Sequence, residues 1–161
     1  MDLGTGCGII AITLAMERHS WKIEGLDIQP HLIELAKYNA ELCSLNIKFH
    51  LANLCTFTAE TPYTLILSNP PWQPLGTGKI SPYPSKNISH FELLCSLPDI
   101  LSFLVRNLAP EGDALLLYPD FRIFELQTLI PKTPLDIFDL TPCVGLDKYY
   151  ICHIRCKGTK Q

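Results

Sequence analysis

The sequence predicts an α/β protein with a doubly wound, mostly parallel sheet and an antiparallel hairpin at its C-terminal end. Apolar segments of strand length alternate with amphipathic segments of helical period up to residue 130, and two further strand-like segments follow. Polar residues fall at the ends of the first four predicted strands: Asp2, Asp27, Asn53 and Asn69. In a parallel sheet these positions share the edge at which ligands bind.

The composition is that of one globular domain. The chain has 161 residues, 47% of them hydrophobic and 18% charged. No apolar run approaches the roughly 20 residues that span a bilayer, and Met1 starts no signal-peptide pattern, so we expect no membrane association. Seven cysteines without a Cys-x-x-Cys pair predict reduced thiols, mostly in the core of a cytoplasmic protein, and no metal site. The net charge of -3 argues against broad nucleic-acid binding but allows a local basic patch.

A glycine-rich loop follows the first predicted strand, Asp2-Leu3. Gly4, Gly6 and Gly8 permit a tight turn and close approach of a ligand, and the helix that begins near Ile9 offers its free N–H groups. A second strand over 22–28 carries Asp27, nineteen positions after Gly8, a spacing that suits a carboxylate holding a ribose diol. Ile9 stands where a dinucleotide-binding loop has its last glycine, so another nucleoside ligand fits better.

The remaining elements continue the alternation. Pro30 opens a helix with Ile33, Ala36, Ala40 and Cys43 on its apolar face. Strands are predicted over 47–52 and 63–68, separated by a loop. A long loop over 73–89 carries Lys79 and Lys86, and we interpret it as a substrate-facing flap.

The C-terminal half is predicted to hold two helices and three strands. The first helix covers 90–108, interrupted at Pro98, with a core stripe of Leu101, Leu104, Val105 and Leu108. Pro110-Glu111-Gly112 ends it, and a strand follows over 113–118. A helix near 121–130 precedes two strands, near 135–141 and 148–156, that can pair as an antiparallel hairpin.

The stretch Asn69-Pro70-Pro71-Trp72 follows the predicted strand over 63–68. The Asn69 side chain presents a carbonyl oxygen, and Pro71 has no N–H that could compete for the carbonyl oxygen of Pro70. Two acceptors beside a Trp face suit a flat group that carries an NH2. Taken alone, Asn-Pro-Pro also fits a simple turn after a strand.

Two motifs together resemble the class I S-adenosylmethionine-dependent methyltransferases, which have a Rossmann-like fold. Asp2-Leu3-Gly4-Thr5-Gly6-Cys7-Gly8 is similar to their first motif, and Asp27 corresponds to their ribose-binding acid. Asn69-Pro70-Pro71-Trp72 is similar to the motif of the branch that methylates planar nitrogens. That branch includes adenine exocyclic-amine methyltransferases and enzymes that methylate a glutamine of peptide release factors.

Within this branch the sequence is most similar to the bacterial tRNA1(Val) adenine-N(6) methyltransferase group. The residues concerned are the Gly- and Lys-containing stretch Pro74–Pro82 and His90-Phe91-Glu92, in which Phe91 replaces the usual His. The resemblance implies S-adenosylmethionine as cofactor and the exocyclic amine of a tRNA adenine as methyl acceptor. Methylation of a release-factor glutamine and an inactive cofactor-binding paralogue are the alternatives.

The resemblance also implies roles for individual residues. Asn69, Pro70 and Trp72 act in catalysis, and Pro71 and Trp72 contact the substrate. Asp2, Gly4, Gly6, Gly8, Asp27 and Asn53 bind the cofactor, with Asn53 at a position where the family commonly has an acid. Lys79 and Lys86 contact substrate phosphates, or are plain solvated loop charges.

The chain is expected to form a single methyltransferase domain over 1–161. The family normally has a complete first strand and an N-terminal segment before the position of Asp2, whereas this sequence begins at the motif. We therefore expect a chain that lacks the start of its first strand and any N-terminal extension.

Overall fold

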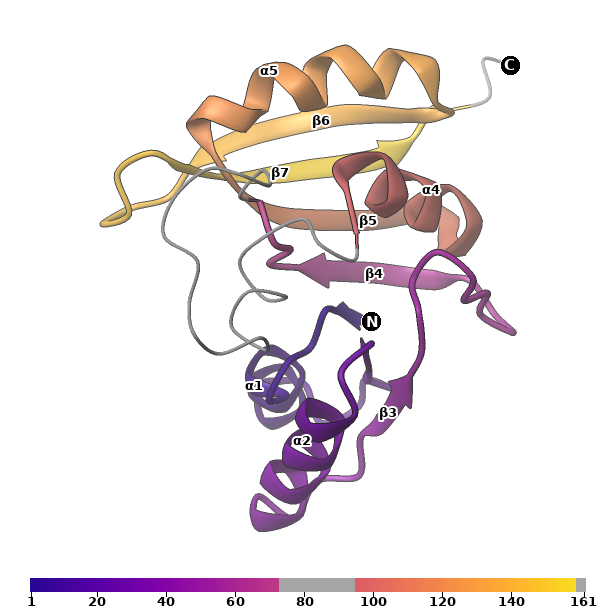
Figure 1. Cartoon of the computed structure of the whole chain (residues 1–161), viewed down its shortest axis with the longest axis vertical. Coiled ribbons are helices and arrows are strands. Elements are labelled where there is room, and N and C mark those ends of the chain that lie inside the picture. Colours follow the sequence, from indigo (N-terminus) through magenta and orange to yellow (C-terminus); the bar gives the residue numbers. More distant parts are fainter. Residues whose placement is uncertain (73–94, 159–161) are drawn as a thin grey trace. The chain divides into compact units, whose positions relative to one another are not determined.

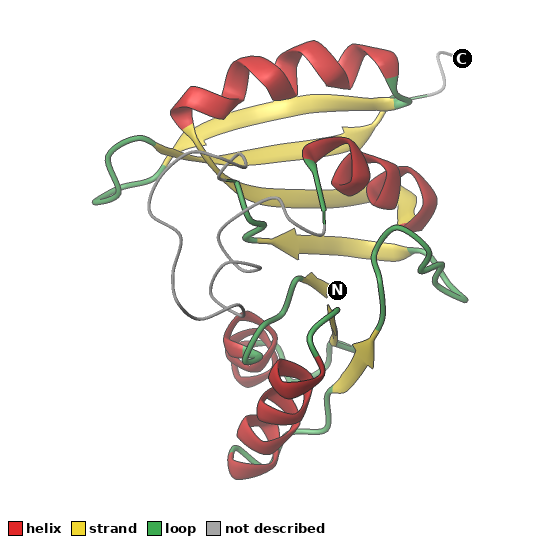
Figure 2. Cartoon of the chain, viewed as in Figure 1, coloured by secondary structure: helices red, strands yellow, loops and turns green. Residues whose placement is uncertain are grey.

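The computed structural model describes residues 1–72 and 95–158, which belong to two compact units (Figures 1 and 2). The first unit comprises residues 1–57 and the second begins at Thr58. The predicted flap with Lys79 and Lys86, and the beginning of the helix expected over 90–108, lie outside the described residues.

The first unit consists of three parallel strands and two helices. The strands are β1 (Asp2–Leu3), β2 (Glu24–Asp27) and β3 (Lys48–Leu51), and the order across the sheet is β3-β2-β1. Helices α1 (Ile9–Glu17) and α2 (Pro30–Leu42) connect them. All five predicted elements are present, with boundaries that differ by one or two residues.

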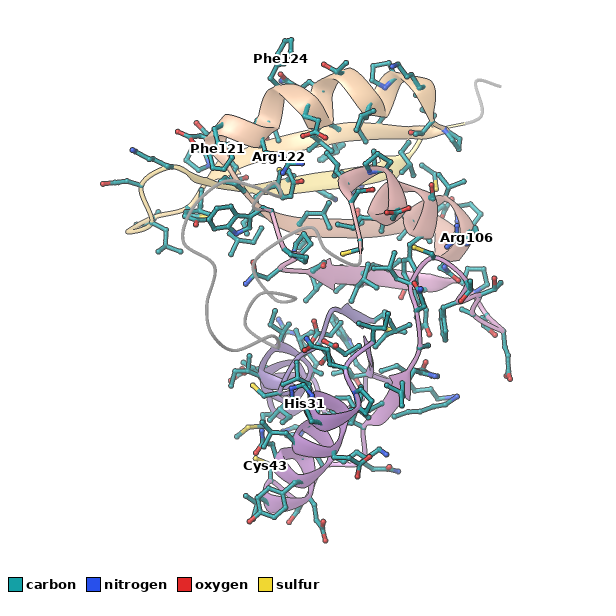
Figure 3. All side chains as sticks on the ribbon, in the orientation of Figure 1. His31, Cys43, Arg106, Phe121, Arg122 and Phe124 are labelled. Carbon is teal, nitrogen blue, oxygen red and sulfur yellow. The ribbon has the colours of Figure 1, made fainter. Side chains whose placement is uncertain are left out.

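Helix α2 shows how the local sequence forms these elements. Pro30 occupies the first turn, where backbone N–H groups have no helical acceptor, so its lack of an N–H costs no hydrogen bond. Ile33, Ala36 and Ala40 recur at helical spacing and are buried. Cys43, expected on the same apolar face, is the exposed C-terminal cap instead, because the helix ends before it can turn inward (Figure 3).

The described part of the second unit is a mixed four-stranded sheet with two α-helices. Its elements are β4 (Tyr63–Ser68), α4 (Leu97–Asn107), β5 (Leu108–Pro119), α5 (Asp120–Leu129), a short 3-10 helix (Ile130–Lys132), β6 (Leu135–Pro142) and β7 (Tyr149–Cys156). The strand order is β4-β5-β7-β6, with β4 and β5 parallel and β7 antiparallel to both of its neighbours. The predicted C-terminal hairpin of β6 and β7 is therefore confirmed.

Two expectations for helix α4 are wrong. Residues 95 and 96 are not helical, and α4 begins at Leu97 because the side chains and backbones of Ser96 and Asp99 form a capping box. Pro98 lies in the first turn of α4, and Val105 faces solvent rather than the core.

Strand β5 begins at Leu108, before the expected start, so residues 110–112 do not lie between helix and strand. They occupy an irregular stretch in which the pairing with β4 jumps from Leu108 to Asp113. Beyond it, side chains alternate between the two faces of the sheet. Ala114, Leu116 and Tyr118 are completely buried on one face.

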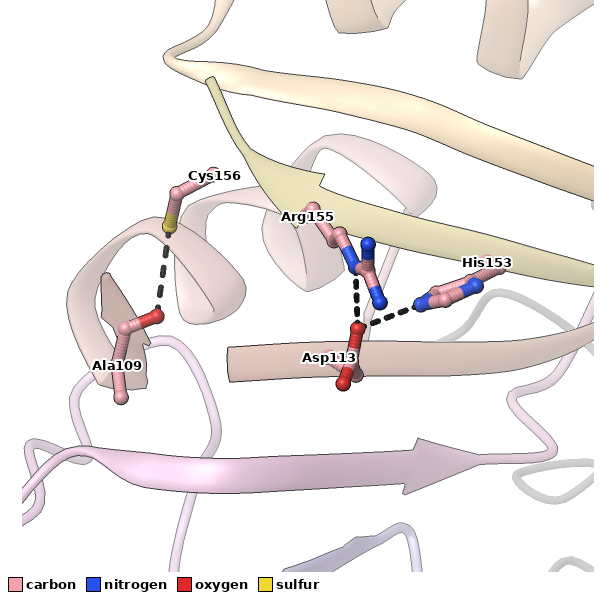
Figure 4. A network of polar contacts seen from close by, with 5 residues as sticks. All are labelled: Ala109, Asp113, His153, Arg155 and Cys156. Atoms are coloured by element: carbon pink, nitrogen blue, oxygen red, sulfur yellow. Dashed lines mark hydrogen bonds and ion pairs between the residues drawn. The ribbon is translucent and has the colours of Figure 1, made fainter. Parts of the chain in front are cut away.

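The opposite face of β5 and β7 carries an ionic cluster (Figure 4). Asp113 Oδ1 lies 2.6 Å from His153 Nε2 and accepts a hydrogen bond of 2.5 Å from Arg155 Nε. The bonds from Arg155 and His153 hold the pKa of Asp113 below its usual value. The Arg155 guanidinium also lies over the Phe138 ring, 3.9 Å from its centroid.

All seven cysteines are free thiols. Only Cys152 is buried, whereas Cys43 and Cys55 are exposed, so the expectation that most lie in the core is wrong. Burial raises the pKa of the Cys152 thiol to about 12. Among the described helices, none combines the length and apolar character that crossing a membrane requires.

Candidate functional site

The glycine loop after β1 adopts the left-handed backbone that its sequence requires. Gly4, Gly6 and Gly8 have φ angles of 75°, 54° and 87°. A side chain at Gly4 or Gly6 would meet no heavy atom of the described residues within 4 Å, so space is open beside the loop. At Gly8 a Cβ atom would lie 3.1 Å from the Cβ of Ala36, so this glycine also permits α1 and α2 to pack closely.

Asp2 holds the loop from beneath. It is buried, and its Oδ2 accepts hydrogen bonds from Thr5 Oγ1 at 2.7 Å and from the Ala11 amide at 3.1 Å. Ala11 is the third residue of α1, and its amide has no helical partner, so Asp2 caps the helix that Gly8 itself cannot cap. Burial raises the pKa of Asp2. Its Oδ1 is also buried and has no hydrogen-bond partner among the described residues.

Asp27 connects the end of β2 to the same loop. Its Oδ2 accepts a hydrogen bond from the Gly6 amide and its Oδ1 accepts one from the Gln29 amide, both at 2.9 Å. The residue is 7% exposed. A carboxylate has about four acceptor positions, so two remain for hydroxyl groups of a ligand.

Asn53 lies two residues after β3 and is exposed. Its Oδ1 accepts a hydrogen bond from the Cys55 amide at 2.9 Å, which makes an Asx turn. The side chain is thereby fixed near the end of the strand. One lone pair of Oδ1 and the amide N–H groups are what it can offer to a ligand.

Several residues that support the loop were not predicted. Asn39 of α2 donates from Nδ2 to the carbonyl oxygen of Cys7 at 2.9 Å. Gly25 in β2 lies so close to Thr5 that an added Cβ would be 2.8 Å from its Oγ1 and 2.7 Å from the Phe49 ring. No local pattern signals these contacts, because each partner comes from another element of the unit.

In the second unit, Asn69-Pro70-Pro71-Trp72 leaves the carboxyl end of β4, as predicted. Asn69 is exposed, Pro70 is buried, and Pro71 and Trp72 are half-buried. The two prolines fix two consecutive φ angles near -65° and contribute no N–H. The motif is therefore a stiff segment that ends in an aromatic side chain.

Trp72 is surrounded by residues from α5 and β7. Its ring meets those of Phe121 and Tyr149 edge to face, each with a centroid separation of 5.9 Å. Its carbonyl oxygen accepts a hydrogen bond of 2.6 Å from Arg122 Nη1. Figure 3 shows Arg122 on the sheet side of α5, while Phe124 points away from the sheet. None of these neighbours was predicted, because they lie about 50 or more residues from Trp72 in the sequence.

Comparison with known proteins finds similar sequences among methyltransferases. Residues 1–79 match the family model of the methyltransferase small domain. Over 74 residues the chain is 36% identical to the release factor glutamine methyltransferase of Bacillus subtilis, covering 45% of this chain and 26% of that protein. Over 114 residues it is 31% identical to the tRNA1(Val) (adenine(37)-N6)-methyltransferase of Phocaeicola vulgatus, covering 70% of this chain and 47% of that protein. The chain thus spans about a quarter to a half of the curated relatives it matches.

Solved structures share the fold across nearly the whole chain. Ribosomal protein L11 methylase from Lactobacillus delbrueckii subsp. bulgaricus matches with a TM-score of 0.71 at 18% identity, over 98% of this chain and 69% of that one. An S-adenosylmethionine-dependent methyltransferase from Clostridium acetobutylicum matches with a TM-score of 0.70 at 9% identity, over 98% and 83%.

The fold is that of the class I S-adenosylmethionine-dependent methyltransferases. In sequence, residues 1–79 are similar to the methyltransferase small domain, whose family model they match.

The residues of the first unit fit the cofactor of this class. S-adenosylmethionine contains a ribose with two free hydroxyls, and the Asp27 carboxylate retains acceptor positions for them. The open space beside Gly4 and Gly6 leaves room for a ligand to approach the backbone. The roles of Asp27, Asn53 and the loop glycines in binding it are our proposals.

Proposed function

We propose that this chain transfers a methyl group from S-adenosylmethionine to the exocyclic amine of an adenine in tRNA. The observation that carries this choice is the extent of the similarity. The match to the tRNA1(Val) enzyme covers 70% of the chain, against 45% for the release factor enzyme. The longer match favours an RNA substrate, because the similarity to this tRNA enzyme extends over more of the chain.

The acceptor site of this reaction is Asn69-Pro70-Pro71-Trp72. The nitrogen of a planar amine is a poor nucleophile, because its lone pair is delocalised into the ring. Asn69 Oδ1 and the Pro70 carbonyl oxygen accept its two hydrogens and favour a tetrahedral nitrogen with a free lone pair. Pro71 leaves the Pro70 carbonyl without a competing neighbouring N–H.

The rest of the mechanism is positioning. Trp72 stacks on the adenine, an interaction worth about 1–3 kcal/mol per base in single-strand binding. S-adenosylmethionine, when bound, supplies an electrophilic methyl group on a sulfonium. Asp27 and the glycine loop would hold this cofactor, and the amine bound by Asn69 and Pro70 would receive its methyl group and lose one proton to water. Lys79 and Lys86 are proposed contacts for the phosphates of the tRNA.

A labelling experiment tests the proposal. The chain is incubated with labelled S-adenosylmethionine and either unmodified tRNA or a peptide release factor, followed by nucleoside and peptide mass spectrometry. We expect label in N6-methyladenosine of the tRNA. Label only in a release-factor glutamine would support the second candidate, to which the 36% identity with the Bacillus subtilis enzyme points. Label in neither would overturn both activities.

A pair of variants tests the role of the motif. Asn69→Ala should lower kcat by roughly a hundredfold or more, because a preorganised group that favours the transition state is lost. Its affinity for S-adenosylhomocysteine should stay unchanged. Asn46→Ala, at an exposed position before β3, is the matched control and should retain full activity. Equal activity of both variants would contradict the assignment of Asn69.

A further inference from the structure

Arg122 is the only buried charged residue in the described part of the second unit. Its exposed fraction is 5%. It belongs to the first turn of α5, which begins directly after β5. Burying a guanidinium is costly unless its hydrogen bonds and its charge are satisfied. This position therefore requires partners that compensate the charge.

The structure supplies those partners from two elements. On α5 itself, Arg122 Nε and Nη2 both lie 2.7 Å from Glu125 Oε2, which balances the charge. Across the unit, Nη1 donates to the Trp72 carbonyl oxygen at 2.6 Å. The guanidinium carbon also lies 5.7 Å from the centroid of the Tyr118 ring. The guanidinium thus connects α5 to the chain that leaves β4.

The hydrogen bond from Arg122 to the Trp72 carbonyl oxygen restricts a part of the acceptor motif that the prolines do not fix. Pro70 and Pro71 have fixed φ angles, so the soft torsions near the end of the motif are ψ of Pro71 and φ and ψ of Trp72. Holding the Trp72 carbonyl fixes the peptide plane that follows its Cα atom. Edge contacts with Phe121 and Tyr149 restrict the indole in the same region. Together these contacts determine the direction in which the indole face is presented.

We propose that Arg122 is a positioning residue for the methyl acceptor, acting through the carbonyl of Trp72. This inference rests on the proposed function, because it assigns the stacking surface for the acceptor base to Trp72. In the structure the Arg122 side chain contacts Trp72, Glu125 and Tyr118. A misplacement of a reacting group by about 1 Å can cost roughly a hundredfold in rate, so loss of this contact should reduce kcat without weakening cofactor binding.

The test compares Arg122→Met, Arg122→Lys and a control. We expect Arg122→Met to lower kcat on tRNA by roughly 10- to 100-fold, with unchanged affinity for S-adenosylhomocysteine. Arg122→Lys keeps the charge and one donor direction, so it should recover part of kcat. Arg18→Met, which removes an exposed Arg stacked on Trp21 in the other unit, should change neither.

A second measurement separates positioning from general stability and needs no substrate. The chain has two tryptophans, so Trp21→Phe leaves Trp72 as the only one. Acrylamide quenching of Trp72 fluorescence, measured well below the melting temperature, should increase in Arg122→Met and less in Arg122→Lys. A lower melting temperature with unchanged kcat and unchanged quenching would overturn the proposal.

The two proposals fail in distinguishable ways. A parent protein that methylates neither tRNA nor release factor overturns the proposed function. In that case quenching alone decides whether Arg122 holds Trp72, and unchanged quenching overturns this inference too. Should Arg122→Met fail to fold, the same measurements on Arg122→Lys decide the question.

Discussion

Replacing Asp27 with Asn tests the structural and the ligand-binding role of this side chain together. In the structure, the two carboxylate oxygens accept the Gly6 and Gln29 amides, both at 2.9 Å, and the residue is 7% exposed. An Asn has one carbonyl oxygen and one NH2 group. One backbone amide therefore keeps an acceptor, while the other faces a donor.

The magnitude follows from that geometry. A buried donor left without a partner costs about 1–3 kcal/mol in the free energy of unfolding. For a domain of this size each kcal/mol lowers the melting temperature by about 2–4 °C, so Asp27→Asn should melt roughly 2–12 °C below the parent protein. A charge-assisted hydrogen bond to a ribose hydroxyl contributes about 1.5–3 kcal/mol, so affinity for S-adenosylhomocysteine should fall roughly 10- to 150-fold.

Thermal melting and isothermal titration calorimetry measure the two effects separately. The matched control is Asp139→Asn on β6, where an exposed carboxylate accepts a hydrogen bond from Thr141. The control should bind S-adenosylhomocysteine like the parent protein. A normal affinity in Asp27→Asn would show that the side chain only supports the loop, and a normal melting temperature as well would refute the reasoning for both roles.

Three further predictions follow from other parts of the structure. Gly25→Ala should lower the melting temperature and weaken S-adenosylhomocysteine binding, because the added Cβ would overlap the Phe49 ring and the Thr5 hydroxyl beside the loop. Such overpacking costs about 1–3 kcal/mol. Unchanged melting and titration curves would contradict this prediction. Iodoacetamide should alkylate exposed Cys43 rapidly and Cys152 only after unfolding, because burial holds the pKa of Cys152 near 12; peptide mass spectrometry reads the outcome, and equal rates would disprove it. The bonds from Arg155 and His153 to ionised Asp113 lower its pKa and stabilise the folded state. This stabilisation is fully present above the unfolded-state pKa of about 3.9 and is lost as the pH falls through the lower, folded-state pKa. The melting-temperature deficit of Asp113→Asn at pH 6 should therefore shrink at acid pH, and a constant deficit would exclude the ionic contribution.

The sequence alone determined the elements that depend on short-range physics. The spacing of Ile33, Ala36 and Ala40 defines a helix face, and the glycines of the loop require positive φ angles that other residues rarely adopt. Asp27 could be assigned to the end of a strand because its position follows from the alternation of strand and helix. The resemblance to class I methyltransferases rested on the glycine loop, Asp27 and the motif Asn69-Pro70-Pro71-Trp72.

One boundary was mispredicted because tertiary pairing overrides local preference, and another because a local capping signal was missed. Pro110-Glu111-Gly112 has the composition of a turn, yet it lies within β5, where an irregular pairing with β4 accommodates it. Pro98 reads as an interruption in a long helical pattern, but a capping box starts the helix only one residue before it. The pairing of β5 depends on tertiary geometry that composition does not specify, whereas the bonds between Ser96 and Asp99 join residues three apart in the sequence.

The supports of both sites depend on tertiary structure alone. Arg122 reaches the carbonyl of Trp72 across 50 residues of sequence, and Asp2 reaches the amide of Ala11 by way of the loop between them. Such contacts leave no periodic signal, because they join single atoms of elements that become neighbours only when the sheet forms. Sequence periodicity records which face of an element is buried, whereas packing decides which partner covers it.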